Sequence, residues 1–318
     1  MMMPVVFRPL LSVIFGLVLA QGALAGVPED REESRSLRVL YVTSVGWFHD
    51  YQRQTELLTR GVSQNLDVSF DVIVGDLPRL MEPDFAVGYD VLVYNFCHAS
   101  RRDPRLVQNL IRPVAEQGIP LLAVHCAMHS FQHVDAWHDF LGLKTLRHED
   151  LRSFTLERDS VHPTTEGLRF PWVLESDELY INMEVSPGSQ SLLKAWGVET
   201  KRDHVQAWLH KVEGTPLLAT TLGHSEKTLS DPQFGEFLAR AIAFLAGELS
   251  DTGEIVDELA CDSSCKPRVR TLTENVRYPT DPERACVLKA LFSSSDPWPA
   301  PEDLWPACLG VKEVSPAR

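Results

Sequence analysis

The sequence has few basic residues, and they are not clustered. Its 318 residues include 30 Lys and Arg against 44 Asp and Glu, which gives a net charge of −14. A surface this acidic repels a phosphate backbone, and no stripe of Lys and Arg offsets that repulsion. Nucleic acid is therefore not an expected partner. The length suffices for one large core, or for one core with a small appendage.

Long apolar runs are also scarce. The first 25 residues contain one, "LLSVIFGLVLA" (10–20), but Gly16 interrupts it and it is too short to span a bilayer comfortably. Arg8 before it and an Ala-x-Ala motif at 23–25 after it are typical of a secretory signal peptide. We predict that residues 1–25 are a cleaved signal peptide and that the mature protein is secreted or periplasmic, without membrane attachment. An uncleaved membrane anchor is the alternative.

Cysteine is scarce until the end of the chain, where four of the six cysteines lie within the last 60 residues. In an oxidising compartment such a cluster predicts two disulfides in a small segment, with three alternative pairings. The Cys-x3-Cys of "CDSSC" (261–265) also resembles half of a zinc knuckle, but no second paired motif accompanies it. Residues 251–318, rich in Pro, Ser and acidic residues, are therefore predicted to be a cysteine-containing C-terminal extension. The four cysteines are Cys261, Cys265, Cys286 and Cys308.

Residues 37–250 alternate between short apolar runs and amphipathic segments. The pattern predicts strands at 37–43, 68–74, 90–96 and 120–125, with helices at 51–66 and 104–118. This alternation is typical of βαβ units, in which helices cover both faces of a parallel sheet. From 152 to 221 the pattern is strand-rich, and a helix at 232–249 closes the domain. The predicted fold class is α/β, with a doubly wound, mostly parallel sheet that follows a polar linker at 26–36.

Histidine is absent from both ends of the chain, since all eleven histidines lie between His49 and His224. Open α/β sheets bind their ligands beyond the carboxyl ends of the strands. Four predicted strand ends each carry an imidazole, so we expect these side chains to meet at one edge of the sheet. The residues at the four ends are Gly46 and His49, Cys97 and His98, His125 and Cys126, and His224.

The ordered motifs of residues 37–249 resemble the trehalose-utilisation (ThuA-like) family. They are "GWFH" (46–49), "VHCA" (124–127), "RHEDLRSFTLERDSVHPTTEGL" (147–168), "SDELY" (176–180), "QAW" (206–208) and "TTLGH" (220–224). The resemblance implies a class I glutamine-amidotransferase-like, three-layer α/β sandwich of the flavodoxin type. It also implies a carbohydrate-directed site, because relatives accompany the breakdown of disaccharides through keto-sugar intermediates. The C-terminal extension lies outside the resemblance.

Amidotransferases of this fold carry a cysteine nucleophile at a sharp turn after a strand, with a His-x-Glu motif downstream. Cys126, His224 and Glu226 offer such a set. However, alignment of the strand on that turn puts His125 at the nucleophile position, and alanines stand where the turn usually has glycines. We therefore expect Cys126 to be a buried thiol that packs as a small apolar side chain. The protein is not expected to be an active glutamine amidotransferase.

A metal site is the second alternative. A helix at 126–140 would place His129 and His133 on one face, at the spacing of zinc hydrolases, but the glutamate of His-Glu-x-x-His is missing. We therefore expect these two histidines and His138 to lie on a hydrated helix face. The expected ligands of zinc, or of another divalent ion, are instead the strand-end histidines His49, His125 and His224.

Metal-free acid–base chemistry is the third alternative. A histidine near its ordinary pKa of about 6.5 accepts and donates protons at neutral pH, and a carboxylate is its usual partner. Glu178 in "SDELY" or Asp50 beside His49 is the candidate partner, unless "DELY" is only an exposed acidic turn. The candidate catalytic residues are His125, His224 and Glu178. The candidate substrate-binding residues are Gly46, Trp47, His49, His98, His162 and Gly223.

Together these patterns predict an exported protein that acts on a small-molecule carbohydrate. The expected reaction is the cleavage or conversion of a glycoside or keto-glycoside by a hydrolase, lyase or isomerase. A divalent metal ion is the one candidate cofactor. A non-catalytic sugar-binding or scaffolding module is the alternative. Replacement of the histidines distinguishes the two, because it abolishes turnover in an enzyme and only lowers affinity in a binding module.

Overall fold

The computed structural model describes residues 36–261, 264–293 and 301–309. The predicted signal peptide and nearly all of the predicted linker lie outside these residues. Within the described part of the chain, no helix combines the length and the apolar character that a membrane span requires.

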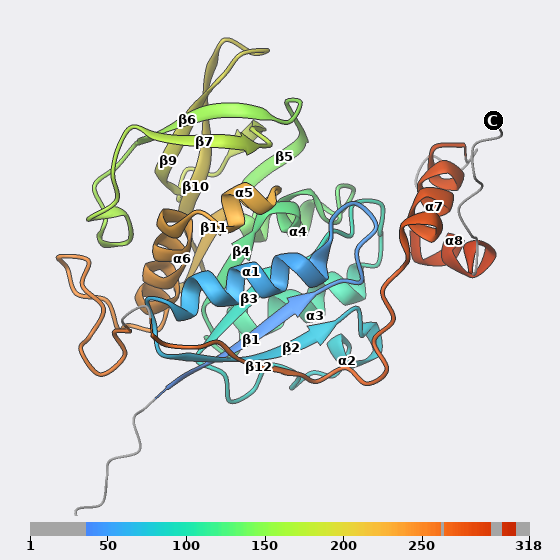
Figure 1. The fold of residues 1–318 in the computed structure, drawn as a ribbon, viewed down its shortest axis with the longest axis horizontal. Coiled ribbons are helices and arrows are strands. Elements are labelled where there is room, and N and C mark those ends of the chain that lie inside the picture. The colour runs from blue at the N-terminus through green and yellow to red at the C-terminus, as the bar shows by residue number, and fades with distance from the viewer. Residues whose placement is uncertain (1–35, 262–263, 294–300, 310–318) are drawn as a thin grey trace, which may run out of the picture. The chain divides into compact units, whose positions relative to one another are not determined.

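One half of the ten-stranded central sheet is parallel (Figure 1). Its strand order is β12-β2-β1-β3-β4-β11, and each of these neighbours pairs in parallel. The strands are β1 (Leu37–Thr43), β2 (Val68–Val74), β3 (Val91–Asn95), β4 (Leu121–Val124), β11 (Thr215–Thr220) and β12 (Arg268–Thr271). The first four confirm the strands predicted from apolar runs. All of them end at one edge of the sheet, because parallel strands run in the same direction.

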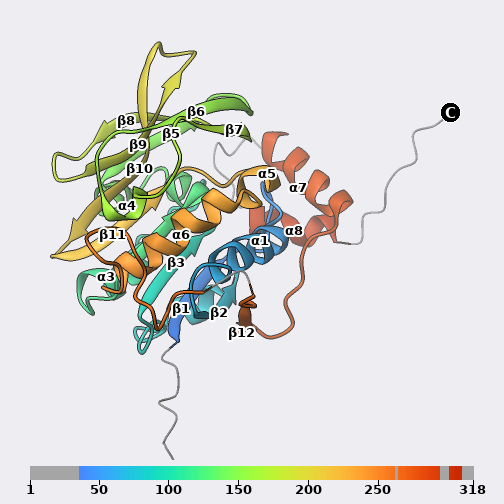
Figure 2. The ribbon, with the colours of Figure 1, turned by 60° about the vertical axis from the view of Figure 1, so that its left-hand side comes forward.

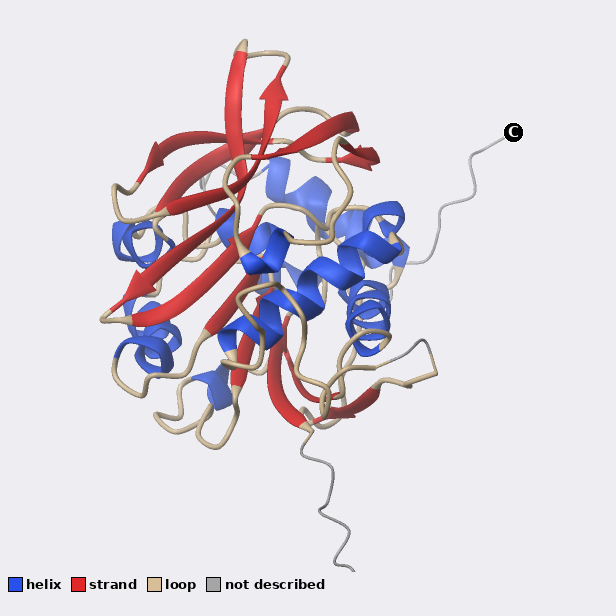
Figure 3. Ribbon diagram, turned by 90° about the vertical axis from the view of Figure 1, so that its left-hand side faces the viewer, coloured by secondary structure: helices blue, strands red, loops and turns tan. Residues whose placement is uncertain are grey.

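The other half of the sheet is antiparallel and continues from β11 in the order β10-β9-β6-β7. A separate antiparallel pair joins β5 to β8 beside it (Figure 2). Figure 3 shows all the strands of the molecule in red. The bounds are β5 (Leu143–His148), β6 (Arg152–Arg158), β7 (Trp172–Asp177), β8 (Tyr180–Val185), β9 (Gln190–Gly197) and β10 (Arg202–Val212). The sequence pattern does not predict β5 or β7, since polar residues interrupt the apolar ones in both.

Helices cover both faces of the parallel half, which makes three layers (Figures 1 and 2). In β1, Val39 and Tyr41 face the core beneath α1 and α6, whereas Leu40 and Val42 face the core that contains α3 and α4. This alternation is the two-residue period of a strand buried on both sides. The helices are α1 (Tyr51–Ser63), α2 (Leu77–Leu80), α3 (Pro104–Ala115), α4 (Asp135–Leu141), α5 (Glu226–Leu229) and α6 (Pro232–Leu245). The predicted α/β class with a mostly parallel sheet is confirmed.

The helix predicted over 126–140 does not form as one element, so that prediction was wrong. A 3-10 turn, η1 (His125–His129), follows β4, and α4 begins only at Asp135. Phe131 lies between them with a φ of 51°, a left-handed conformation that no α-helix contains. Consequently His129 and His133 do not share a helix face.

The C-terminal extension is joined to the main sheet. Its strand β12 pairs in parallel with β2, and the helices α7 (Asp281–Ser293) and α8 (Pro301–Cys308) follow. Disulfides link Cys261 to Cys265 and Cys286 to Cys308, which confirms the two predicted bonds and selects one of the three pairings.

Candidate functional site

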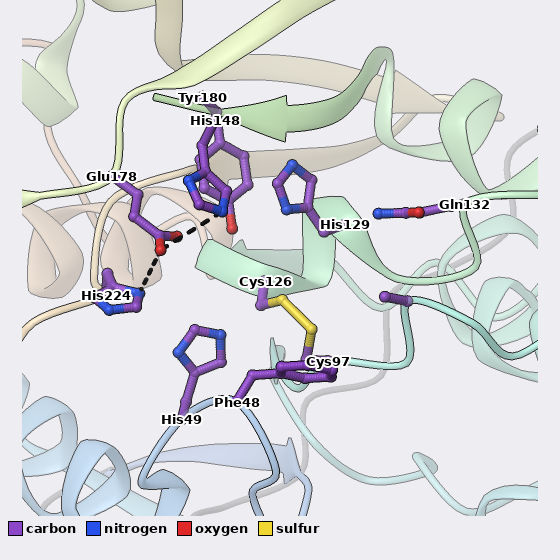
Figure 4. Close-up of a pocket in the computed structure, with 11 residues that line it drawn as sticks. Phe48, His49, Cys97, Cys126, His129, Gln132, His148, Glu178, Tyr180 and His224 are labelled. Atoms are coloured by element: carbon purple, nitrogen blue, oxygen red, sulfur yellow. Dashed lines mark ion pairs between the residues drawn. A yellow bond between two sulfur atoms is a disulfide. The ribbon is translucent and has the colours of Figure 1, made fainter. Parts of the chain in front are cut away.

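A cavity of about 290 Å³ lies at the edge where the parallel strands end (Figure 4). Its lining combines residues that follow β1, β3, β4 and β11 with residues of β5, β8 and the corner before β8. The lining residues are Phe48, His49, Cys97, Ala99, Cys126, His129, Gln132, His148, Glu178, Tyr180 and His224. Neither Lys nor Arg is among them, so no fixed cation faces a ligand in this cavity.

Three of the strand-end histidines form a triangle at the base of this cavity. The ring centroids of His49, His125 and His224 lie 4.8, 5.0 and 5.3 Å from one another. One nitrogen from each ring falls within 4.8 Å of the others, a separation that a single metal ion can bridge with small adjustments. Gly46 permits the turn that brings in His49: its φ is 88°, and a Cβ there would lie 2.3 Å from the His49 carbonyl oxygen.

His125 lies beneath the cavity and is fully buried. Its Nδ1 is 2.8 Å from the carbonyl oxygen of Thr221, and because a carbonyl only accepts, Nδ1 carries the hydrogen. The Nε2 lone pair therefore points elsewhere, and it has no hydrogen-bond partner. The nearest charged group is Glu178, whose Oε2 is 3.7 Å from Nε2. A lone pair of His125 thus lies close to an acidic oxygen without a hydrogen bond between them.

Glu178 is the carboxylate around which the imidazoles gather. Its Oε1 lies 3.2 Å from His224 Nδ1 and 3.5 Å from His148 Nε2 (Figure 4). The residue is 9% exposed, so the interpretation of "DELY" as an exposed acidic turn was wrong. The corner between β7 and β8 carries the carboxylate from the antiparallel half to the histidines of the parallel half.

Asp177 holds that corner in place. It is fully buried, and its carboxylate accepts hydrogen bonds from three backbone N–H groups. Those of Glu178 and His224 donate to Oδ1 over 2.8 and 3.1 Å, and that of Gly223 donates to Oδ2 over 3.0 Å. One buried side chain thus ties the turn after β11 to the corner before β8. Gly223, predicted to bind substrate, contributes its backbone to this tie.

The charges of the site follow from burial and from Glu178. Burial and the neighbouring imidazoles hold the pKa of His49 well below its ordinary value. Burial also lowers the pKa of His125, although Glu178 opposes that shift. Burial would lower the pKa of His224 too, but the hydrogen bond and charge of Glu178 outweigh it and raise that pKa. For Glu178 itself, burial acts to raise the pKa, and the surrounding histidines lower it overall.

The cavity wall contains three residues that the sequence reasoning did not select. His129 stacks on Tyr180 with centroids 4.0 Å apart, and His148 stacks on the same tyrosine at 5.5 Å. Burial and the adjacent His148 lower the pKa of His129 to about 3, so it is neutral at physiological pH. The expectation of a hydrated helix face was wrong for His129 and His138, which are buried, whereas His133 is exposed. The family-like motifs already contained His148 and Tyr180, which was the available signal.

Cys126 is not a free thiol, because it forms a disulfide with Cys97 whose Cα atoms are 5.0 Å apart. The prediction of a buried thiol was therefore wrong, and a disulfide sulfur cannot act as a nucleophile or as a thiolate ligand. Every cysteine of the chain is paired. Three disulfides in one protein indicate an oxidising compartment, extracellular or periplasmic.

The remaining candidates lie away from the cavity lining. Trp47 packs against Trp305 of α8, and its neighbour Phe48 lines the cavity instead. Asp50 caps the N-terminus of α1, where its side chain accepts a hydrogen bond from the Arg53 backbone N–H. His98 packs between Phe96 and Phe131, and His162 contacts Phe244 of α6.

The fold and the cavity define an α/β protein with a histidine–carboxylate site at the carboxyl edge of its sheet. The chain belongs to the trehalose utilisation (ThuA) family, which it matches over residues 38–245. It is similar to the crystal structure of a ThuA-like protein from Parabacteroides merdae, with a TM-score of 0.55 and 16% identity over 74% of this chain and 98% of that one. A ThuA-like protein from Bacteroides uniformis is similar with a TM-score of 0.53 and 15% identity over 72% and 98%. No curated protein matches the chain significantly.

Proposed function

We propose that this exported protein cleaves or converts a glycoside or keto-glycoside, with Glu178 as the proton-transferring group and a divalent metal ion held by three histidines. The observation that carries the proposal is the unpartnered Nε2 lone pair of His125, which faces the Glu178 carboxylate. Two neutral imidazoles and a third beside them form a donor set that suits zinc or a similar ion.

The surroundings of the histidines fit a metal site. His125 donates its other ring hydrogen to a backbone carbonyl, the interaction that orients most metal-binding histidines. Glu178 lies beside nitrogens of His125 and His224, and His49 and His224 line the cavity, as expected of a catalytic rather than a structural site. When bound, a divalent ion polarises a carbonyl or lowers the pKa of a water molecule. A divalent ion would require the unprotonated form of His224, whose pKa Glu178 raises, so metal affinity should fall at acid pH.

The chain's own residues supply the proton transfers. Glu178 is kept ionised by its histidine neighbours, so it is ready to accept a proton from a substrate carbon or from water. His148, 3.5 Å from Glu178 and partly exposed, connects that carboxylate to solvent and exchanges the proton. The stacked His129 and Tyr180 offer a flat wall for the apolar face of a sugar ring.

The cavity favours a neutral sugar. It lacks Lys and Arg, the residues that recognise phosphate and carboxylate groups. Its volume of about 290 Å³ is at the small end of ligand pockets, which suits one sugar ring inside and the rest of a glycoside outside.

Elemental analysis of the purified, tag-free mature protein tests the metal, with zinc, manganese and iron measured in wild type and in three variants. We expect near-stoichiometric metal in wild type and in His133→Ala, whose histidine is exposed, and loss of metal in His125→Ala and in the His49→Ala/His224→Ala double variant. A keto-glycoside screen on the same samples should show turnover falling by about 100-fold or more with the metal. Metal retained in the double variant contradicts the site, and saturable sugar binding without turnover identifies a binding module.

A further inference from the structure

The C-terminal extension reaches the cavity edge because of its topology. It lies beyond the family match, which ends at residue 245. Its strand β12 runs parallel to β2, so the chain leaves that strand at the same edge where the cavity lies. Two hydrogen bonds hold the exit: Leu272 N–H donates to the carbonyl of Val72, and Val74 N–H donates to Thr273 Oγ1 over 2.9 Å.

The helices that follow form a cross-linked pair. The disulfide between Cys286 of α7 and Cys308 of α8 joins them, and Arg277 lies over the Trp305 ring at 5.2 Å while it pairs with Glu283 at 2.6 Å. Trp305 is therefore held in two ways, by the disulfide that fixes α8 to α7 and by the Arg277 cation on its ring face.

Trp305 meets the loop between β1 and α1, drawn in blue in Figure 1, which extends toward α7 and α8. Its ring is 4.9 Å from that of Trp47 in an edge-to-face arrangement, and Trp47 is only 3% exposed. The next two residues of this loop turn the other way. Phe48, 38% exposed, and His49 both line the cavity.

We propose that Trp305 is a positioning residue for the cavity: by holding Trp47, the extension fixes the loop that presents Phe48 and His49. Val287 and Cys308 of the extension also pack in the cluster that contains Trp47 and Trp305, so the extension forms a buttress on this side of the site. That His49 matters for activity rests on the proposed function. The packing of the extension on the loop is argued independently, from the contact between Trp305 and Trp47 and from the disulfide between α7 and α8. Packing of Trp47 against the extension should therefore keep this loop ordered, with Phe48 and His49 facing the cavity.

Hydrogen exchange of the full mature protein tests the buttress without any ligand. Trp305→Ala should accelerate exchange of residues 44–50 by about tenfold or more, while β1 and β4 remain protected. Trp305→Phe, which keeps an aromatic ring, should restore protection, and Leu309→Ala, an exposed residue just after α8, should change nothing. If Trp305→Ala fails to fold, the Cys286→Ser/Cys308→Ser variant loosens the same helices and should accelerate the same segment. Unchanged exchange at 44–50, or an equal effect of Leu309→Ala, overturns the proposal.

A cobalt-loaded sample separates this inference from the proposed function. Trp305→Ala should alter the visible absorption spectrum of bound cobalt, and Trp305→Phe should return it to that of wild type, since the spectrum reports the position of His49. If wild type binds no cobalt, the metal part of the proposed function fails and the exchange experiment still decides the role of Trp305.

Discussion

The parallel and antiparallel halves of the sheet contribute different chemistry to one cavity. The parallel half supplies imidazoles from the ends of β1, β4 and β11, two of them kept neutral by burial. The antiparallel side supplies the carboxylate of Glu178, together with His148 from β5 and Tyr180 from β8. Neither half holds both the histidine triangle and the ionised group. The candidate site therefore forms only where the two halves meet.

The comparison also shows how differently the two sets are positioned. Each histidine of the parallel half follows its own strand, so the direction of the strand is enough to bring it to the edge. Glu178 stands at a corner, and the buried Asp177 holds that corner to the turn after β11 through three backbone hydrogen bonds. Separate replacement of Asp177, which holds the corner, of Glu178, which carries the charge, and of His129 in the cavity wall tests this difference in positioning.

Removal of the tie should have the largest effect. Asp177→Ala leaves two buried N–H groups and one partly buried N–H group without their acceptor, and we expect the free energy of unfolding to fall by about 3 kcal/mol or more. Urea denaturation measures the change, with the exposed Asp150→Ala as the matched control. Asp177→Asn, which keeps one acceptor oxygen, should be intermediate. Equal stability of Asp177→Ala and wild type would show that the corner is held by other contacts.

Removal of the charge should have a smaller, pH-dependent effect. In Glu178→Gln, the main opposing influence on His224 is lost and only the charge of Asp177 still opposes burial, so the pKa of His224 should fall. Titration of the imidazole protons by NMR measures this decrease. A His224 pKa equal to that of wild type would assign the upward shift to another group.

The same pair sets a window of stability. His224, whose folded pKa is raised, stabilises the fold below about pH 6.5 and loses that contribution as the pH rises through its folded pKa. Glu178, whose folded pKa is lowered, contributes above about pH 4.5 and loses its contribution as the pH falls through its folded pKa. The difference in unfolding free energy between wild type and Glu178→Gln should therefore be largest from about pH 4.5 to 6.5 and should shrink above that range.

Replacement in the wall should have the smallest effect at neutral pH. His129 is neutral in the folded protein down to a pKa of about 3, so the unfolded chain takes up a proton first as the pH falls below about 6.5. This uptake destabilises wild type by up to about 1.4 kcal/mol per pH unit. His129→Phe keeps the stacking on Tyr180 and should remove that part of the slope in denaturation experiments between pH 7 and 5. The exposed His133→Ala should change the slope much less, and an unaltered slope in His129→Phe contradicts the assignment.

The fold was largely predictable because its signal is local. The apolar runs that became β1 to β4 are buried on both faces, so they read as continuous stretches in the sequence. The prediction of a helix at 126–140 was wrong because Phe131 adopts a left-handed backbone conformation. A phenylalanine gives no sequence signal for that conformation. β5 was missed because it is a short, partly polar strand that pairs only with β8.

In the candidate site, residues placed by strand direction were predictable, and residues placed by contacts remote in the sequence were not. Strand-end histidines were selected because parallel strands share an edge. Trp47 belongs to the same loop as His49, but its side chain packs against Trp305, more than 250 positions away. Burial of His129 depends on Tyr180, and the partner of Cys126 depends on the proximity of Cys97, neither of which has a local signature.

By itself, the sequence determined the α/β class, the edge at which the histidines gather and the cysteines that pair in the extension. These follow from periodicity and strand direction, which are properties of short segments. Only the tertiary structure decided that Glu178 lies among the imidazoles, that Cys97 and Cys126 are bonded, and that the extension packs on the loop of the cavity. Charge, burial and side-chain direction at these points are set by residues remote in the sequence, and packing brings those residues together.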